Sequence, residues 1–598
     1  MSATTVFPAP PRPSARARAP HLRIVVVLLT SLWLVLGPIV AEARIRVQLS
    51  GVDGEAAANV RAWLDLVRFA EREDLSEAAV RRLYDRAPRQ IREALRPFGY
   101  YDARVVSRSL TRDGGDWIAR FEIQPGEPVR LTSVRLQVVG EGRDHPSFMA
   151  LLAEAPLAEG RQLRHPDFDQ LRARLERAAS THGFFDRSFP ERRLEIDPAA
   201  LSASAILVMD TGPRYRFGEV VIDQDILNQS LIDRLVFTRE GEPFDNERLL
   251  RTQYALTDSQ YFANVVVETG ERDPATRTVP VNVETVPSRR QRIRLGVGYG
   301  TDTRARGSIG WDWRRINQRG HRANMQLQVS QPITELSTQY IIPFGDPLRE
   351  RLSIRSTLAA EDLADVSSQR ATLGVNHRRV LGNWQRNLFA DVVDERTRLP
   401  DGARFSDTSI VPGIGFERLI ADDPLVPTRG HRLRAEVRGS HGLLAARTDF
   451  LRIHLGASRV TSPGDDWRLA LRGELGLGIV DGFGELPASQ RFFAGGDQSV
   501  RGYGFNKLGP TDEEGRSIGG RHLVFGSVEV QRRISGPWHV AAFVDTGGAL
   551  ARLDDTPEVS AGLGVHFLTP IGRIRVEVAQ PLTESRSPRL HISIRPDL

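Results

Sequence analysis

Cysteine is absent from all 598 residues, which excludes disulfide bonds, thiolate metal sites and cysteine nucleophiles. The sequence also lacks a His-Glu-x-x-His zinc motif, a Gly-x-Ser-x-Gly nucleophile elbow and a Gly-x-x-x-x-Gly-Lys-[Ser/Thr] phosphate loop. Charged residues make up 26% of the chain, with a formal net charge of +6, and the two signs are interspersed rather than gathered into a basic patch. These absences leave no argument for an enzyme, a cofactor, a bound metal or a nucleic-acid partner.

Apolar runs long enough for a membrane-spanning helix are missing as well. The strongly apolar stretch at residues 24–36 has 13 residues, against the roughly 20 that a helix needs to cross a bilayer. Arginines precede it and the small-x-small pattern of residues 41–43 follows it, which predicts a signal peptide over residues 1–43. An uncleaved anchor is the alternative. If the mature chain enters a membrane, it must do so as strands.

A pattern recurs three times between Arg44 and Ser288. A helical segment ends on Gly99, Gly183 or Gln260, and two aromatic residues and a strand-like segment follow each time, at intervals of 84 and 77 residues. A period near 80 predicts a small domain present in three copies, over residues 44–127, 128–211 and 212–288. Strand patterns at the start of each copy and a hairpin at its end predict the element order β-α-α-β-β.

Local signals in these copies predict how the helices begin and pack. Asp167 and Asp245 are expected to be N-caps that accept the unpaired backbone N–H groups of a first helical turn. Apolar residues recur on one face of the helix after Asp167, so that face should pack on a sheet. The aromatic pairs are expected to serve the core and the junctions between domains rather than to bind a ligand.

From about Arg289 the helical period disappears and strand alternation takes over. In residues 467–479 the side chains of one parity are apolar, and the other parity carries Arg468, Arg472, Glu474 and glycines. We count 16 such segments of about ten residues over residues 289–598, which predicts a transmembrane β-barrel with an apolar outer face and a polar lumen. A soluble β-sandwich is the alternative, although it would not need so many strands behind a signal peptide and three repeats.

Three segments of the predicted barrel carry a family resemblance. They are RFFAGGDQSVRGY (residues 491–503), FVDTGGA (residues 543–549) and GLGVHFLTPIGRIRVEVAQPL (residues 562–582). With the three repeats before them, they resemble the outer-membrane assembly superfamily that includes BamA and TamA. The resemblance implies three periplasmic POTRA domains followed by a 16-stranded barrel in the bacterial outer membrane. It also implies that Val500, Arg501, Gly502 and Tyr503 form the tip of the sixth extracellular loop, folded back into the lumen.

An arginine in a barrel lumen needs an acidic partner, because a desolvated guanidinium without one is costly. Asp545 is the expected partner, since Val540 and Val544 share the opposite strand parity and are expected to face lipid. Glu529 lies on the inner parity of the preceding strand and is the expected second acceptor.

Three repeats without a preceding plug helix resemble the TamA family within this superfamily. The resemblance implies a cofactor-free factor that assists insertion of autotransporters and other barrel proteins. Its implied partners are unfolded outer-membrane protein clients, outer-membrane lipid and an inner-membrane-anchored TamB-like protein that spans the periplasm. A two-partner secretion transporter with one cognate exoprotein is the alternative, and a passive porin is a third class.

The seam between the first and last barrel strands is expected to pair poorly and to template incoming strands. The first strand carries Gly296, Gly298 and Gly300 on one parity, which weakens it. The last strand contains Ile592 and Ile594, and its Pro596 cannot donate to a ladder. A position near Ile592 is expected to face Gly298.

Overall fold

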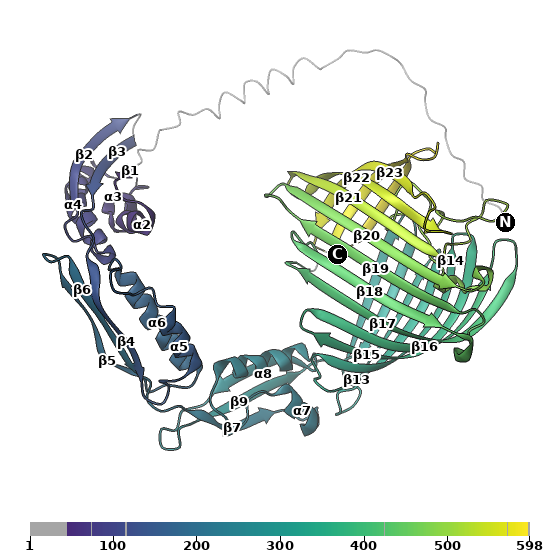
Figure 1. Cartoon of the computed structure of the whole chain (residues 1–598), viewed down its shortest axis with the longest axis horizontal. Coiled ribbons are helices and arrows are strands. Elements are labelled where there is room, and N and C mark those ends of the chain that lie inside the picture. Colours follow the sequence, from purple (N-terminus) through teal and green to yellow (C-terminus); the bar gives the residue numbers. More distant parts are fainter. Residues whose placement is uncertain (1–44, 73–74, 114–115, 424, 571, 596–598) are drawn as a thin grey trace, which may run out of the picture. The chain divides into compact units, whose positions relative to one another are not determined.

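The computed structural model describes residues 45–72, 75–113, 116–423, 425–570 and 572–595. The expected signal peptide and Pro596 lie outside the described residues. The chain divides into two compact units, one ending at Arg214 and the other beginning at Tyr215. The first contains two repeats, and the second contains the third repeat together with the barrel (Figure 1). No helix in the described part of the chain combines the length and apolarity needed to cross a bilayer.

The first repeat contains a three-stranded sheet with strand order β1-β3-β2, in which β1 runs parallel and β2 antiparallel to β3. Its elements are β1 (Ile45–Ser50), α2 (Gly54–Trp63), α3 (Asp65–Arg68), α4 (Glu77–Leu95), η1 (Arg96–Phe98), β2 (Arg104–Asp113) and β3 (Asp116–Gln124). The expected pair of helices is wrong here, because Leu64 adopts an extended backbone that separates α2 from α3. The Leu64 side chain is fully buried in the core of the repeat, which fixes this break.

The second and third repeats have the expected order β-α-α-β-β. The second consists of β4 (Arg130–Val139), α5 (Pro146–Ala153), α6 (His165–Thr181), β5 (Ser188–Asp197) and β6 (Ser202–Asp210). The third consists of β7 (Arg216–Asp223), α7 (Gln229–Leu235), α8 (Asn246–Asp258), β8 (Phe262–Thr269) and β9 (Thr278–Pro287). Their sheets have the orders β4-β6-β5 and β7-β9-β8. On α6, Phe168, Leu171 and Leu175 are buried in the core of the second repeat, as the apolar face predicts.

The recurring aromatic motif follows a helix end of one conformation. Gly99, Gly183 and Gln260 all adopt the left-handed region, with φ angles of 84°, 83° and 66°. A left-handed residue ends a helix and turns the chain, so the aromatic pairs are delivered to equivalent places. In the third repeat Tyr261 is buried. In the first repeat the Tyr101 hydroxyl lies 3.0 Å from Nε2 of His165, the first residue of α6 in the second repeat. The pairs therefore serve both cores and junctions.

The two predicted N-caps have different outcomes. The Asp245 side chain accepts a hydrogen bond from the backbone N–H of Glu247 at 2.8 Å, which confirms the first cap of α8. The prediction for Asp167 is wrong, because α6 begins earlier, at His165, and Arg164 is its N-cap. Proline has a backbone angle suited to the first helical turn, and Pro166 lies in that turn.

The second unit contains a 16-stranded sheet in which every strand pairs antiparallel with its neighbours in the sequence, from β10 to β25. Figure 1 shows these strands in teal, green and yellow. They are β10 (Gln291–Gly300), β11 (Arg304–Trp313), β12 (Arg322–Ser330), β13 (Ile333–Pro343), β14 (Glu350–Leu363), β15 (Val366–Leu381), β16 (Trp384–Arg398), β17 (Arg404–Ala421), β18 (Gly430–Ser440), β19 (Phe450–Thr461), β20 (Trp467–Val480), β21 (His522–Ser535), β22 (Trp538–Leu550), β23 (Glu558–Thr569), β24 (Gly572–Pro581) and β25 (Arg589–Arg595). The predicted fold class, three α+β repeats before a 16-stranded barrel, is confirmed.

The two faces of each strand follow the sequence alternation. On β20, Trp467, Leu471 and Ile479 are exposed on the outer surface, whereas Arg468 is buried on the opposite face. This is the distribution that a lipid-facing exterior and a polar lumen require.

The third repeat is fastened to the barrel by polar contacts at the turn between β11 and β12. The Tyr261 hydroxyl donates to the Gly320 carbonyl at 2.6 Å, and the Asn228 backbone N–H donates to the Gln318 carbonyl at 2.8 Å. Burial raises the pKa of Tyr261, so its phenol stays protonated and keeps donating. The junction aromatic of this repeat therefore fixes the repeat to the barrel.

Candidate functional site

The segment between β20 and β21, residues 481–521, packs against the lumen side of the barrel. Val500, Tyr503 and Leu508 form one buried apolar cluster with the inward-facing Leu523 and Phe525 of β21. This cluster fixes the loop around Arg501 against the barrel wall and excludes water from it.

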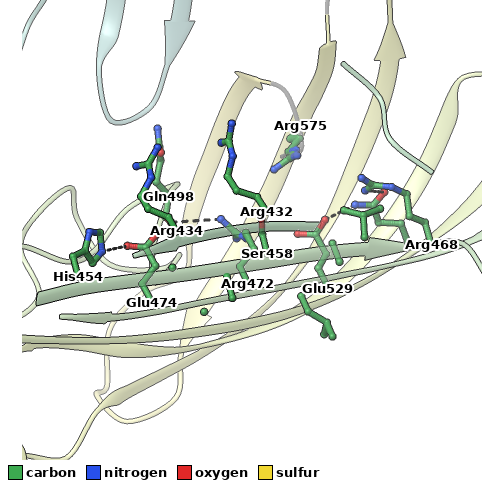
Figure 2. A pocket seen from close by; sticks show the side chains of 17 residues that line it. Arg432, Arg434, His454, Ser458, Arg468, Arg472, Glu474, Gln498, Glu529 and Arg575 are labelled. Carbon is green, nitrogen blue, oxygen red and sulfur yellow. Dashed lines mark hydrogen bonds and ion pairs between the residues drawn. The ribbon is translucent and has the colours of Figure 1, made fainter. Parts of the chain in front are cut away.

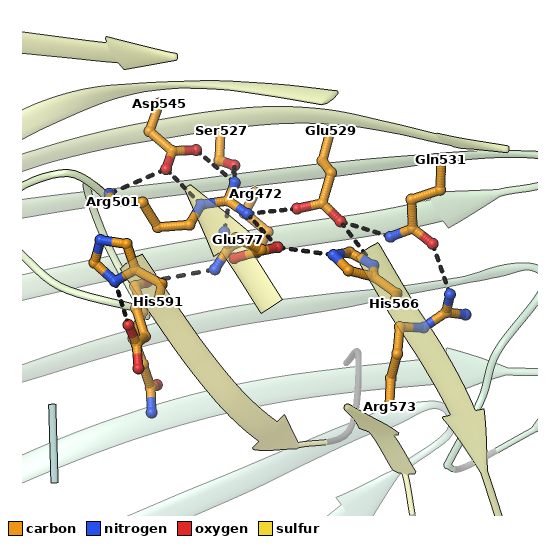
Figure 3. Close-up of polar contacts among 12 residues, drawn as sticks. Arg472, Arg501, Ser527, Glu529, Gln531, Asp545, His566, Arg573, Glu577 and His591 are labelled. Atoms are coloured by element: carbon orange, nitrogen blue, oxygen red, sulfur yellow. Dashed lines mark hydrogen bonds and ion pairs between the residues drawn. The ribbon is translucent and has the colours of Figure 1, made fainter. Parts of the chain in front are cut away.

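Arg501 is 0% exposed, and each of its five side-chain N–H groups has an acceptor (Figure 3). Nε and Nη2 donate to the two carboxylate oxygens of Asp545 at 2.7 and 2.8 Å. Nη1 donates to Glu529 at 2.6 Å and to Glu577 at 3.0 Å, and Nη2 also donates to the Ser527 hydroxyl at 3.3 Å. The guanidinium carbon lies 3.3 Å from the centre of the Phe543 ring. The structure thus brings Arg501 together with both expected acids.

Glu577 of β24 is a third carboxylate on Arg501 that the sequence reasoning missed. The signal was present, because Val576 and Val578 are exposed on the outer face and so place Glu577 on the inner parity. Its Oε1 also lies 2.8 Å from Nε2 of the buried His566. The anchor of Arg501 therefore draws on β21, β22 and β24 at once.

The residues on either side of Arg501 extend the contacts of the loop. The Tyr503 hydroxyl donates to Glu558 at 2.8 Å. Gly502 has a φ of 93°, and a Cβ atom there would lie 3.2 Å from Pro581, so a larger residue is disfavoured by both backbone and space. Its backbone N–H donates to Nε2 of His591 on β25 at 2.8 Å.

Asp497 links this loop to both sides of the seam between β10 and β25. Its carboxylate accepts the Thr301 hydroxyl at 3.0 Å and the Nδ1–H of His591. Its backbone N–H donates to the Asp302 carboxylate at 2.6 Å. Thr301 and Asp302 follow β10, and His591 lies on β25, so one loop residue touches the first and last strands together. Sequence reasoning missed this group, because nothing local indicates where a long loop returns.

The seam itself has no ladder among the described residues, since β10 and β25 are the two ends of the sheet order. The Thr301 backbone N–H donates to the Ile592 carbonyl at 3.1 Å, and Arg306 donates to the Ile594 carbonyl at 3.1 Å. Gly300 is the glycine of β10 that lies against Ile592 itself, two residues beyond Gly298. A Cβ atom on Gly300 would lie 3.5 Å from the Ile592 carbonyl, whereas Gly296 and Gly298 lie against side chains of β11.

Two groups of side chains have the composition of metal ligands, Asp302 with Asp497 and His591, and Glu529 with His566 and Glu577. In the first, Nε2 of His591 accepts an N–H, so Nδ1 carries the proton that Asp497 accepts and offers no lone pair. In the second, both carboxylates form ion pairs with the Arg501 guanidinium. The carboxylates of both groups already accept hydrogen bonds or form ion pairs within the protein, so we assign no metal ion to either group.

A second polar region of the lumen is a cavity of about 480 Å³ (Figure 2). Five arginines line it, together with His454, Glu474, Gln498 and Glu529, and the arginines are Arg432, Arg434, Arg468, Arg472 and Arg575. Several of them have protein acceptors, such as the Pro427 carbonyl for Arg468 at 3.3 Å and Glu417 for Arg432 at 3.2 Å. This cavity is a polar part of the lumen with a basic lining.

Two protein-family models together match most of the described chain. Residues 289–591 match the Omp85 superfamily domain, and residues 46–125 match POTRA domain TamA domain 1. The outer membrane protein assembly factor BamA of Nitratidesulfovibrio vulgaris is 24% identical over 391 residues, covering 61% of this chain and 48% of the relative. A SAM50-like protein of Schizosaccharomyces pombe is 24% identical over 188 residues, 28% of this chain and 39% of the relative. The chain thus spans about half the length, or less, of these curated relatives.

Among solved structures, the fold is similar to that of BamA from Haemophilus ducreyi lacking POTRA domains 1–3. The TM-score is 0.63 at 15% identity, and the match covers 78% of this chain and 99% of that one. At this identity the likeness concerns the fold alone.

Proposed function

This chain belongs to the Omp85 superfamily, and from that premise we propose that it is a TamA-type factor that helps insert autotransporters and other β-barrel proteins into the bacterial outer membrane. Members of this superfamily are assembly or transport factors, which confirms that the chain is not an enzyme. Its barrel is an outer-membrane barrel and its POTRA domains are periplasmic, as expected. The match of the first repeat to a TamA-type POTRA domain supports the narrower assignment.

The missing ladder between β10 and β25 is the observation that carries this proposal. A strand edge without a partner exposes N–H and C=O groups that an incoming strand can pair with, which is β-augmentation. The outer side chains of β10 are unusually accessible, with Leu295 77% and Val297 95% exposed. A client strand added at this edge would cover them, so the seam offers hydrogen bonds and apolar contact together.

The partners follow from the same arrangement. Unfolded outer-membrane protein clients are the proposed ligands of the seam, and outer-membrane lipid is the proposed solvent of the apolar outer face. We also propose that the repeats receive a TamB-like periplasmic protein. Their three-stranded sheets leave β1 and β2, and the equivalent strands of the other repeats, as edges that can accept a further strand.

A cross-link tests the seam directly, because the native chain has no thiol to interfere. Gly300→Cys with Ser593→Cys places both thiols on the lumen face of the seam, since Ser593 pairs with the inward Arg575. Oxidation closes the seam, and we expect client assembly to stop and to return on reduction. The control is Val392→Cys with Ile410→Cys, which joins register partners in the ordinary ladder of β16 and β17. If the oxidised seam variant assembles clients as well as the reduced one, strand templating at the seam is wrong. Loss of one secreted exoprotein alone, with barrel clients unaffected, would indicate a two-partner secretion transporter.

A further inference from the structure

Four arginines line a cavity of about 250 Å³ where the lumen meets the third repeat, and three of them, all except Arg349, belong to barrel strands. They are Arg322 of β12, Arg351 of β14 and Arg378 of β15. Ser259 and Tyr261, just after α8, complete the cavity from the side of the repeat. Arg322 reaches across this junction, because its Nη1 donates to the Ser259 carbonyl at 3.4 Å and its guanidinium lies 5.7 Å from the centre of the Tyr261 ring.

Two of these cations face each other directly. Arg351 and Arg378 are register partners on neighbouring antiparallel strands, so their side chains leave the same face of the sheet side by side. Like charges in this position destabilise a sheet. The charged groups that act on Arg351 are Arg378 and Arg322, both cations. Within the described residues, the Arg351 side chain has no hydrogen-bond or ion-pair partner.

Other inward arginines of the same strands are paired. Arg355 of β14 forms an ion pair with Asp391, and Arg370 of β15 forms one with Glu361 at 3.1 Å. Two carboxylates, Asp258 and Glu350, also line the cavity. Glu350 lies 2.9 Å from His377, and Glu417, which acts on Arg378, is held by Arg432. Positive side chains therefore outnumber the carboxylates around the cavity, and among the described residues no carboxylate forms an ion pair with Arg351 or Arg378.

We propose that this cavity binds a phosphate-type oxyanion between Arg351, Arg378 and Arg322. The planar fork of a guanidinium matches the oxygens of a phosphate, and a doubly charged oxyanion removes the repulsion between the register-paired arginines. The ligand is either free inorganic phosphate or the phosphate of a lipid headgroup. Because Arg322 also touches the third repeat, a bound oxyanion stiffens the junction between that repeat and the barrel. This inference is independent of the proposed assembly function.

The first experiment measures thermal unfolding of the full chain by intrinsic tryptophan fluorescence, in a non-ionic detergent that carries no phosphate group. Inorganic phosphate is titrated against chloride at equal ionic strength. We expect phosphate to raise the unfolding temperature saturably in the native protein. In Arg351→Gln the apparent affinity should fall by about tenfold or more, the loss expected for one charge-assisted hydrogen bond. The same loss is expected in Arg378→Gln, which covers the case in which one variant does not fold.

The matched control is Arg370→Gln, which removes an equal charge from a paired inward arginine and should retain the phosphate effect. Without phosphate, Arg351→Gln should unfold at a temperature no lower than the native protein, because the variant removes a repulsion. After delipidation, equal phosphate stabilisation of the native protein and Arg351→Gln, or loss of the effect in Arg370→Gln, would overturn the proposal.

The second experiment distinguishes the source of the oxyanion. Phospholipid that co-purifies with the protein is extracted and quantified by its phosphorus content and mass. If a headgroup occupies the cavity, the native protein retains more anionic phospholipid than Arg351→Gln, and added phosphate has no further effect until the lipid is removed. If free phosphate is the ligand, the two proteins retain equal lipid and phosphate stabilises the native protein at once. Equal lipid retention with no phosphate effect before or after delipidation contradicts the proposal.

Discussion

Arg501→Ala removes the residue that holds the lumen loop to the barrel. The substitution deletes the side-chain hydrogen bonds to Asp545, Glu529, Glu577 and Ser527 and leaves the carboxylates in place. Asp545 is 0% exposed, so water does not replace the lost guanidinium without a rearrangement of the loop. The variant therefore leaves a buried charge without its counter-ion.

Breaking a buried ion pair by removing one partner costs about 3 to 5 kcal/mol, because the other charge stays desolvated. Three carboxylates share this one guanidinium, so the cost should fall at the upper end of that range unless the loop detaches. Arg501→Lys restores the positive charge but offers three N–H donors instead of five. We expect Arg501→Lys to be intermediate, since an ammonium does not reproduce the bidentate contact with Asp545.

The free energy of unfolding in detergent, measured by urea titration, reports the cost to the barrel, and trypsin cleavage at Lys507 reports the loop. Arg501→Ala should lose stability and be cleaved faster at Lys507. The control is Arg516→Ala, which removes a solvent-accessible arginine of the same loop that pairs with Asp512 at 2.7 Å. Exposed ion pairs contribute little, so this control should resemble the native protein. If Arg501→Ala is as stable and as protected as Arg516→Ala, the anchoring role is wrong.

Three further predictions concern the junctions and the seam. Burial lowers the pKa of His165, so the folded repeats favour its neutral form. The stability of these repeats should be full above about pH 6.5 and should fall as the pH drops below it. His165→Gln should remove this pH dependence, as measured by limited proteolysis between pH 5 and 8. Tyr261→Phe leaves the Gly320 carbonyl without its donor and should cost about 1 to 3 kcal/mol in the same urea titration. Thr301→Val keeps the shape of the side chain but removes its hydroxyl bonds to Asp497 and to the Ile592 N–H. Cysteines at positions 300 and 593 should therefore form a disulfide more slowly, and an unchanged rate would contradict this.

Strand parity was sufficient to identify the acids around Arg501. Asp545 and Glu529 were expected because apolar neighbours on the same strands had to face lipid, and the same argument would have found Glu577. The aromatic motif could also be predicted from the sequence. Gly99 and Gly183 each adopt the left-handed conformation that ends a helix, and the aromatic residues follow directly in the chain. Features that depend on one strand or one helix are thus accessible from the sequence.

Other features depend on distant segments meeting, and local patterns did not reveal them. Asp497 meets His591 only because a long loop returns to the last strand. No ladder fixes the position along β10 that lies against Ile592. Gly298 and Gly300 share one strand parity, so alternation alone did not show that Gly300 is the residue in contact with Ile592. The register of Arg351 with Arg378 likewise follows from the lengths of the intervening turn and strands rather than from the composition of either strand.

The contacts of the lumen loop are unequal on the two sides of the seam, and this determines what moves if the seam opens. On the side of the last strands, Arg501 is bound to β21, β22 and β24, and Gly502 is bound to His591 of β25. On the side of the first strand, the loop is held through Asp497 to Thr301 and Asp302. Charge-assisted hydrogen bonds to the anchor are more numerous and fully buried, so the contacts of Asp497 with the turn after β10 should break first. We therefore infer that an opening seam separates β10 from a loop that stays with β21–β25, which leaves the edge of β10 free while the lumen remains occupied.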